Sequence, residues 1–397
     1  MSVDKPAHRG RKPLHFVVLI GVVSLLADVT YEGARSIIGP YLGLLGASAA
    51  TIGIVAGLGE FAGQGLRIVF GYLSDHLRRY WALTILGYAV NLLAVPALAL
   101  AGRWEIAAAL IVTERLGKAI RTPARDAMLA SASRSIGRGW AFALHEALDQ
   151  TGAVTGPLVM SFVLASKRPY SEAFAVLLVP ALLALLVLFA ARIIYPHPDK
   201  LDPTPEPPEK AELRGPFRLY LVAAALVAAG YADFALIAYH FQNTGMLADS
   251  SIPLLYAGAM GVDALAALWM GRRYDRRGLR ALLLPIAVSS LFAPLVFSTQ
   301  PNLAVLGLAC WAVGLGAQES IMRAAVADLV PAERRATGYG IFHGAYGLAW
   351  FAGSAVMGSL YASSLRLMMA FSVLLQLAAL PLILKVGRQQ KKIGVRA

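Results

Sequence analysis

The sequence predicts an all-α polytopic membrane protein with twelve transmembrane helices in two pseudo-symmetric six-helix bundles. Three observations lead to this fold class. Of the 397 residues, 58% are apolar and 15% are charged, whereas soluble domains carry roughly 25% charged residues. Apolar runs of about 20 residues, the length that crosses a bilayer, recur along the whole chain. The single cysteine excludes an intramolecular disulfide, and the composition excludes an ordinary soluble enzyme or a disordered chain.

The positions of the apolar runs define twelve spans. The first run continues past Asp28 to Tyr41 without a small-residue cleavage site, so we interpret it as a span rather than a signal peptide. The runs are too long, and too rich in leucine, alanine and glycine, for porin strands. The predicted spans are residues 15–38, 48–72, 80–101, 104–123, 139–165, 170–194, 219–243, 252–271, 280–299, 302–327, 336–361 and 365–385.

The basic residues are distributed unevenly between the two sides of the membrane. With the N-terminus inside, 29 of the 36 lysines and arginines fall on the cytoplasmic side and four on the outer side. This bias follows the positive-inside rule. The net charge of +13 is therefore a topology signal and not a nucleic-acid surface. We expect a multi-pass protein of the inner (cytoplasmic) membrane with both termini in the cytoplasm.

The chain divides into two related halves. Residues 196–216 contain seven prolines and mixed charge, which is typical of an extended linker. We therefore predict an N-terminal bundle at 1–195, a cytoplasmic linker at 196–216 and a C-terminal bundle at 217–397. Three patterns recur at offsets near 200 residues, which indicates a duplicated unit. They are Gly71 and Asp75 with Gly271 and Asp275, Asp28 and Arg35 with Asp233 and His240, and Phe142–His145 with Gly340–His343.

Several motifs together resemble those of the major facilitator superfamily over nearly the whole chain. The run Gly271–Arg280 is close to that superfamily's loop signature, and Gly71–Arg79 is a degraded copy. Gly152–Pro157 resembles the core of the antiporter motif in the fifth helix, although its trailing glycine pair is replaced by Val159 and Met160. The runs Glu114–Asp126 and Ala141–Asp149 resemble a bacterial subgroup of largely unassigned substrate, with some relatives linked to export of metals or toxic compounds.

The resemblance implies a latch between helices at the two loop motifs. A short turn of this kind places a carboxylate at a helix end, where it can pair with basic groups. The latch residues are Gly71, Asp75, Arg79, Gly271, Asp275, Arg276, Gly278 and Arg280. Alternatively, these arginines are only topology markers.

Arg121, Arg125 and Asp126 lie near the cytoplasmic surface, where we expect gating or loop structure. Gly152, Gly156 and Pro157 predict close helix packing and a kink, with or without a bearing on antiport.

Ionisable residues inside the spans are the candidate transport site. Each costs roughly 2.5–3.5 kcal/mol at a helix centre and therefore normally faces a cavity or a partner. The candidates for proton coupling or substrate binding are Asp28, Glu32, Arg35, Glu60, Arg67, Glu114, Arg115, His145, Asp149, Asp233 and Glu319. We favour Asp28 and Glu32 for the proton or substrate, Glu114 with Arg115 for the central site, and His145 with Asp149 as a relay. The alternative is a set of structural ion pairs, such as Asp28 with Arg35, Glu60 with Arg67 and Glu319 with Arg323.

These features predict a secondary transporter that exchanges protons for a small molecule by alternating access. Proton-coupled efflux of a drug, toxic compound, metal or metal chelate is the favoured function, and proton-coupled import or uniport of an organic solute is the alternative. The sequence contains no nucleophile elbow, zinc-protease helix or nucleotide loop, so we do not expect an enzyme. We expect neither a cofactor nor a bound metal centre, and we expect a monomer in the lipid bilayer. A further alternative is a transporter-like sensor that moves no substrate.

Overall fold

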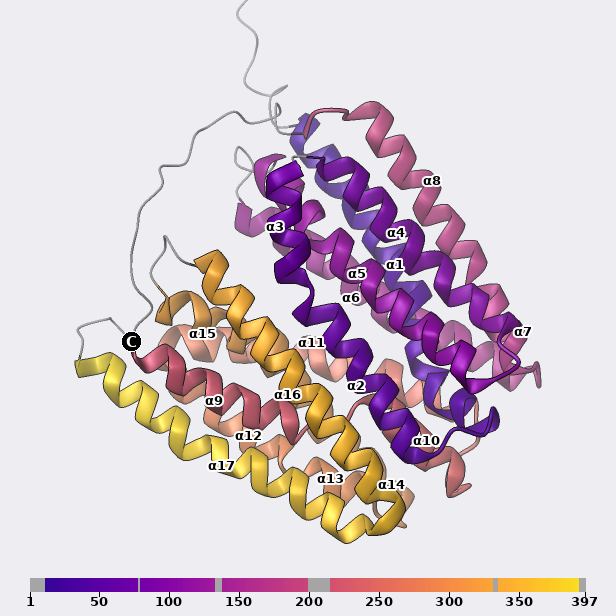
Figure 1. Ribbon diagram of the computed structural model, residues 1–397, viewed down its shortest axis with the longest axis vertical. Helices are drawn as coiled ribbons and strands as arrows, with labels where there is room; N and C mark the ends of the chain where they lie inside the picture. Colours follow the sequence, from indigo (N-terminus) through magenta and orange to yellow (C-terminus); the bar gives the residue numbers. More distant parts are fainter. Residues whose placement is uncertain (1–10, 78, 133–137, 199–214, 331–334, 393–397) are drawn as a thin grey trace, which may run out of the picture. The chain divides into compact units, whose positions relative to one another are not determined.

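A computed structural model shows an all-α chain in the residues that it describes, which are 11–77, 79–132, 138–198, 215–330 and 335–392 (Figure 1). Every predicted span coincides with one helix or with consecutive helical segments. Within the described residues, nine helical stretches are long and apolar enough to cross a membrane. The other three predicted spans are the long helices α5, α6 and α16. The predicted all-α polytopic membrane fold is thereby confirmed.

The helices of the N-terminal part have the following bounds. They are α1 (Arg11–Leu44), α2 (Ala49–Gly65), α3 (Arg67–Leu77), α4 (Tyr80–Ala97) with the short 3-10 turn η2 (Leu98–Leu100), α5 (Trp104–Ala132), α6 (Arg138–Ala165), α7 (Tyr170–Val176) and α8 (Leu178–Ile194). Helix α2 begins at Ser48, whose side chain accepts a hydrogen bond from the Thr51 amide at 3.1 Å. This N-cap satisfies one of the free amides of the first turn.

The C-terminal part begins after the predicted linker, of which residues 199–214 lie outside the described residues. Its elements are α9 (Gly215–Ala229), α10 (Phe234–Asn243), α11 (Ser251–Arg277), η5 (Gly278–Leu282), α12 (Leu283–Ser289), α13 (Phe292–Val296), α14 (Pro301–Gly316), the π-helical turn η6 (Ala317–Ile321), α15 (Met322–Leu329), α16 (Arg335–Ser363) and α17 (Leu365–Lys392). Gly278 is the C-cap of α11, and its φ of +56° is accessible to glycine without strain.

Two compact units are defined by which residues pack together. Unit 1 comprises residues 1–34 and 69–207, and unit 2 comprises residues 35–68 and 208–397. Helix α1 contributes to both units, and α2 belongs to unit 2. These units interleave along the chain, so the division into an N-terminal bundle, a linker and a C-terminal bundle stays a prediction.

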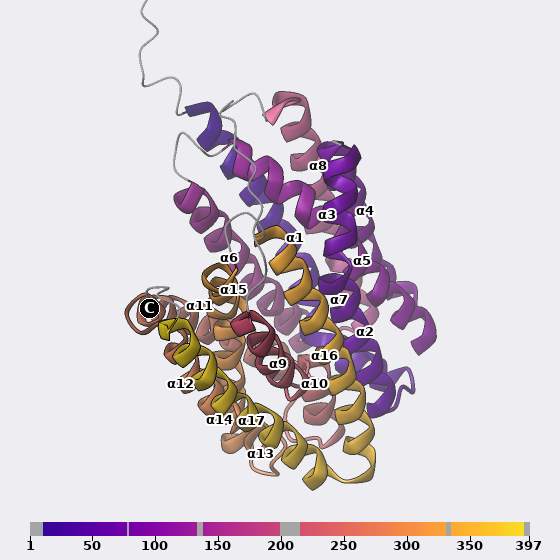
Figure 2. The same ribbon diagram turned by 60° about the vertical axis from the view of Figure 1, so that its left-hand side comes forward.

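Unit 1 is built around α4 and α5, which pack along each other (Figure 2). Helix α8 packs on α4, and α6 packs on α5 and α7. One end of the core is aromatic: the Phe16 ring meets the rings of Trp81 and Tyr195 edge to face, at centroid distances of 6.3 and 5.5 Å. The Trp81 indole also donates a hydrogen bond to the Tyr195 carbonyl at 3.1 Å.

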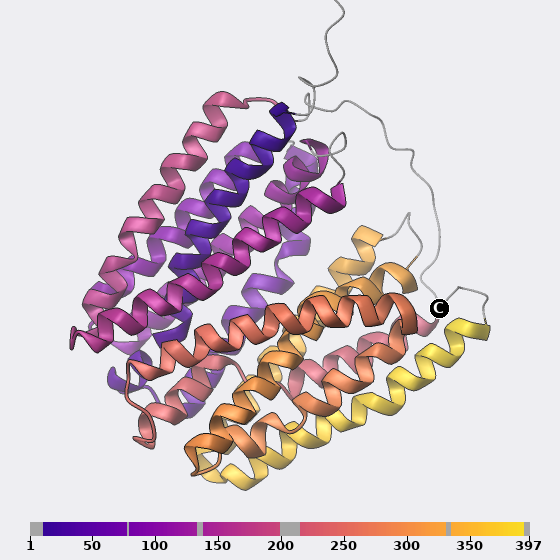
Figure 3. The ribbon, with the colours of Figure 1, turned by 180° about the vertical axis from the view of Figure 1, so that it is seen from behind.

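Unit 2 places α16 against α2 and α9, while α17 runs along α9 (Figure 1) and α11 lies beside α14 (Figure 3). Its core contains the fully buried rings of Tyr231, Phe234 and Trp311. The contact between α2 and α16 is close because glycines carry no side chain. A Cβ atom on Gly57 would lie 2.9 Å from the Phe351 Cα, a distance that real Cβ atoms essentially never show.

Candidate functional site

Close helix contacts in unit 1 bring charged side chains of α1, α5 and α6 into its interior. Gly152 of α6 faces α1, where a Cβ atom would lie 2.8 Å from the Asp28 Cβ. Gly156 meets the backbone of α1 in the same way, since a Cβ there would lie 2.8 Å from the Gly33 nitrogen. Gly87 forms the corresponding contact between α4 and α5, because a Cβ atom on it would lie 2.7 Å from the Arg121 Cβ. These glycines therefore set the spacing between α6 and α1 and between α4 and α5.

The buried and half-buried charges of this interior form what we call the unit 1 charge cluster: Asp28, Glu32, Lys118, Arg121 and Asp149. Asp28 and Glu32 are 6% and 7% exposed. The electrostatic neighbours of Asp28 include Asp149, Lys118 and Glu32, and the Tyr31 hydroxyl is its hydrogen-bond partner. The carboxylate of Asp28 therefore shares the interior of unit 1 with two other carboxylates, which repel it, and with a lysine, which attracts it.

Aromatic rings cover the basic members of the cluster. The Lys118 Nζ lies 4.0 Å from the centroid of the Tyr31 ring, and the Arg121 guanidinium carbon lies 4.2 Å from the centroid of the Tyr88 ring. Such cation–π contacts partly replace the hydration that a buried cation loses. Arg121, which the sequence placed near the cytoplasmic surface, is 1% exposed and lies in the interior of unit 1.

A chain of polar contacts leads from Asp149 to α1. The His145 Nδ1 lies 3.4 Å from the Asp149 Oδ2, and the His145 Nε2 lies 2.8 Å from the Ser24 Oγ. Ser24 is fully buried and also contacts the Tyr88 hydroxyl at 3.1 Å. Sequence reasoning missed Ser24, although it lies one helical turn before Asp28 on the same face of α1.

Arg125 of α5 extends this series of polar contacts beyond Ser24. Its Nη1 donates a hydrogen bond to the Ser24 Oγ at 3.1 Å. Its Nε and Nη2 lie 2.9 and 2.8 Å from the Asp126 Oδ1. Arg125 and Asp126, predicted as gating or loop residues, are thus joined to each other and, through Ser24, to His145.

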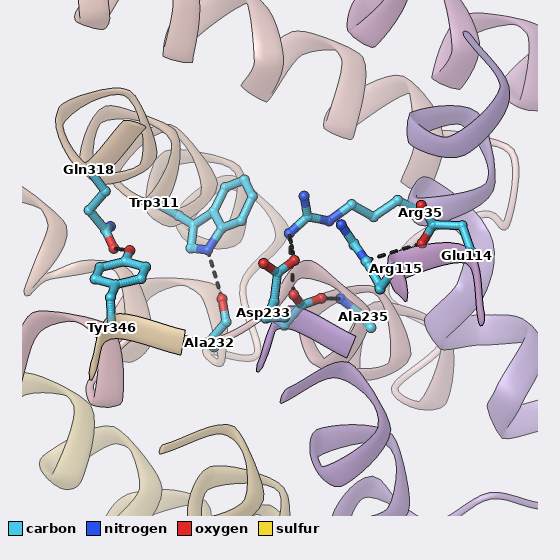
Figure 4. Close-up of polar contacts among 10 residues, drawn as sticks. Arg35, Glu114, Arg115, Ala232, Asp233, Ala235, Trp311, Gln318 and Tyr346 are labelled. Carbon is cyan, nitrogen blue, oxygen red and sulfur yellow. Dashed lines mark hydrogen bonds and ion pairs between the residues drawn. The ribbon is translucent and has the colours of Figure 1, made fainter. Parts of the chain in front are cut away.

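Glu114 and Arg115 form a second pair in unit 1. The Arg115 Nε lies 3.2 Å from the Glu114 Oε2 (Figure 4), and both side chains are buried. Asn91 of α4 donates hydrogen bonds to the Glu114 Oε1 at 2.7 Å and to its backbone oxygen at 3.1 Å. Asn91, which sequence reasoning also missed, therefore holds the Glu114 carboxylate in place.

An ion triad occupies the interior of unit 2. The Arg35 Nη2 lies 3.3 Å from the Glu60 Oε1 and 3.3 Å from the Asp233 Oδ2, and Figure 4 shows Arg35 pointing at Asp233. The three side chains are 10%, 8% and 5% exposed. The structure thus pairs Arg35 with Glu60 and Asp233, partners that the sequence did not suggest for it.

Asp233 lies at a break in the seventh predicted span. Its side chain accepts a hydrogen bond from the Ala235 amide at 2.9 Å and so caps the N-terminus of α10. Residues 230–233 separate α9 from α10. Two carbonyls of the break accept hydrogen bonds from side chains: Gly230 accepts from Ser372 at 2.6 Å, and Ala232 accepts from Trp311 at 2.9 Å (Figure 4). Discontinuous helices of this kind mark binding sites in secondary transporters.

Glu319 lies on a second irregularity, the π-helical turn η6. Arg323 donates a hydrogen bond to the Glu319 backbone carbonyl. The neighbouring Gln318 accepts a hydrogen bond from the Tyr346 hydroxyl (Figure 4). Such π turns are frequent at functional sites. Arg67 is the first residue of α3, and Gln64, in the last turn of α2, contacts the His343 Nδ1 at 3.0 Å.

The two predicted latch motifs lie at helix ends. Gly71 is in α3, and Gly271 is in α11. Arg79 precedes α4 and is exposed, as are Arg276 and Arg280. The side chains of Asp75 and Asp275 lie outside the described residues, so the latch stays a prediction. Pro157 lies inside α6, one residue after Gly156.

Comparison with known proteins identifies the class. The profile of the Major Facilitator Superfamily matches residues 20–354 and 234–395. An uncharacterized protein of Mycobacterium tuberculosis (strain H37Rv) is 42% identical over 374 residues, which cover 92% of this chain and 91% of the relative. An uncharacterized MFS-type transporter of Methanocaldococcus jannaschii is 26% identical over 372 residues, covering 91% and 92%.

Solved structures show the same fold. The nucleoside transporter NupG superposes with a TM-score of 0.73 at 13% identity, covering 92% of this chain and 98% of NupG. A bacterial homolog of the human lysosomal transporter Spinster superposes with a TM-score of 0.74 at 15% identity, covering 98% and 99%. The family profile and the membrane-length helices show that the chain is a multi-pass membrane protein of the secondary-transporter class. It belongs to the Major Facilitator Superfamily.

Proposed function

We propose that the protein is a proton-coupled exporter of a small molecule, and that the unit 1 charge cluster couples the inward flux of protons to the outward flux of the substrate. The carrying observation is that the buried Asp28 carboxylate has Asp149, whose side chain is 19% exposed, as an electrostatic neighbour. Two neighbouring carboxylates that are largely shielded from water are costly when both are ionised, so a proton or a cationic group is expected to be held between them. Competition of proton and substrate for these carboxylates is a minimal antiport mechanism.

The remaining features support the same proposal. Lys118 and Arg121 hold one of the carboxylates ionised, so that only one proton needs to be exchanged. Gly152 and Gly156 keep α6 against α1, the two helices that carry Asp149 and Asp28. The resemblance of Gly152–Pro157 to an antiporter motif favours export. The positive-inside bias favours the inner membrane with cytoplasmic termini. We expect the substrate to be a drug, toxic compound, metal or metal chelate.

The experiment begins with a ligand search, because ligands that bind the folded state raise its apparent stability. Thermal-shift measurements on the purified protein would use lipophilic cations, divalent metal ions with and without a chelator, nucleosides and dipeptides. The ligand found is then followed in proteoliposomes with an imposed pH gradient and a known protein orientation.

Two variants test the role of the carboxylates. We expect Asp28→Asn and Asp149→Asn each to lower proton-driven flux at least tenfold, while ligand-induced stabilisation persists in at least one of them. Asp249→Asn, which removes an exposed carboxylate, is the control and is expected to leave flux unchanged. Unchanged flux in both cluster variants would refute proton coupling at this site. Net import down the same gradient would replace export with uptake of an organic solute.

A further inference from the structure

Arg125 is linked to Asp149 through Ser24 and His145, and the direction of each polar contact in this series follows from the chemistry of the groups. The Arg125 Nε and Nη2 are engaged by Asp126, which aims the remaining Nη1 at the Ser24 Oγ, 3.1 Å away. A guanidinium only donates hydrogen bonds. The Ser24 oxygen is therefore an acceptor toward Arg125, and its own hydrogen is left for His145 or Tyr88.

The contact between His145 and Asp149 decides where that hydrogen goes. A neutral imidazole carries one N–H, and its other nitrogen presents a lone pair. If Nδ1 carried the lone pair, it would face the Asp149 Oδ2 at 3.4 Å, which is repulsive when the carboxylate is ionised. Nδ1 must then carry the hydrogen, so Nε2 accepts from the Ser24 hydroxyl at 2.8 Å. The Tyr88 hydroxyl in turn donates to Ser24 at 3.1 Å.

The two oxygens of Asp149 are consequently unequal. Oδ2 faces the His145 N–H, whereas Oδ1 is buried without a hydrogen-bond partner among the described residues. We propose that Ser24 is a positioning residue that, together with the ionised Asp149 carboxylate, holds His145 as the neutral Nδ1–H tautomer, which makes Oδ1 the oxygen of Asp149 that binds the proton. This rests on the proposed function in one respect, that Asp149 takes up and releases a proton.

The charged and titratable groups around Asp149 come from every helix packed there. They are Asp28 and Tyr31 of α1, Tyr88 of α4, Lys118, Arg121 and Arg125 of α5, and His145 and Glu146 of α6. Burial and the cations Arg125 and Arg121 oppose a positive charge on the imidazole, so the histidine serves as a fixed donor. Asp28 is the group whose own proton uptake must be separated from that of Asp149.

The first test reads the tautomer directly and needs no substrate. The full chain, labelled with 15N-histidine and held in lipid nanodiscs, is followed by solid-state NMR from pH 5 to pH 9, and His145→Gln assigns the signal. We expect His145 to show a protonated Nδ1 and a bare Nε2 near pH 7. Ser24→Ala is expected to give a mixture of tautomers, and Ser24→Thr to restore the single one. An Nε2–H tautomer or an imidazolium in the unaltered protein would overturn the inference.

The second test follows proton uptake by Asp149 through the infrared C=O band of its protonated carboxyl group. The band is identified by its loss in Asp149→Asn. All spectra are recorded in an Asp28→Asn background, so that Asp28 does not contribute. In Ser24→Ala, Asp149 loses a donor to its ionised form, so the titration midpoint is expected to rise by about one pH unit. Ser24→Thr should return it, and Thr113→Ala, which removes an exposed hydroxyl of α5, should not move it. An unmoved midpoint in Ser24→Ala refutes the inference. A correct tautomer with no proton-driven flux refutes the proposed function alone.

Discussion

Arg35 is expected to be the most sensitive charged residue of unit 2, because two buried carboxylates depend on it. Replacing it by methionine, which has a similar length and no charge, leaves Glu60 and Asp233 without the guanidinium that lies 3.3 Å from each. Side chains that are 10%, 8% and 5% exposed gain little compensating hydration. Removing one partner of a buried ion pair costs about 3–5 kcal/mol, and here two carboxylates are affected. We therefore expect Arg35→Met to lower the free energy of unfolding by at least about 3 kcal/mol.

The assay is reversible unfolding in mixed detergent micelles, because thermal scans of membrane proteins are commonly irreversible. Adding Glu60→Gln and Asp233→Asn to Arg35→Met should recover part of the loss, since the neutral amides no longer need a counter-charge. Arg103→Met is the matched control: its pair with Glu105 is exposed, and we expect no measurable change. A loss below about 1 kcal/mol for Arg35→Met would refute the reasoning, since that is the range of surface pairs.

Two further predictions concern packing and a buried polar contact. Gly152→Ala should lower the free energy of unfolding, because its new methyl group would lie 2.8 Å from the Asp28 Cβ. Gly258→Ala, with open space around it, is the control and should be neutral or stabilising by up to about 1 kcal/mol. Equal effects of the two variants on the free energy of unfolding would contradict the close contact at Gly152. Asn91→Ala should cost about 1–3 kcal/mol because the buried Glu114 carboxylate loses its donor, and an unchanged unfolding free energy would show that this contact is not made.

The sequence alone predicted the fold class, the positions of the spans and the superfamily. These properties are local: a run of about 20 apolar residues must form a helix in a bilayer, because every backbone group has to be satisfied within the segment. The same locality explains why buried ionisable residues such as Asp28 and Glu60 were found, since a charge inside an apolar run is visible without knowing its neighbours.

The tertiary structure decided which of these residues meet. Arg35 contacts Glu60 and Asp233, which are 25 and 198 residues away in the chain, and no helical periodicity relates such positions. Ser24 and Asn91 entered the site only as partners of His145 and Glu114, because an uncharged polar residue gives little signal in sequence. Pairing depends on how closely helices approach, and that distance is set by contacts between helices that the periodicity of one helix does not contain.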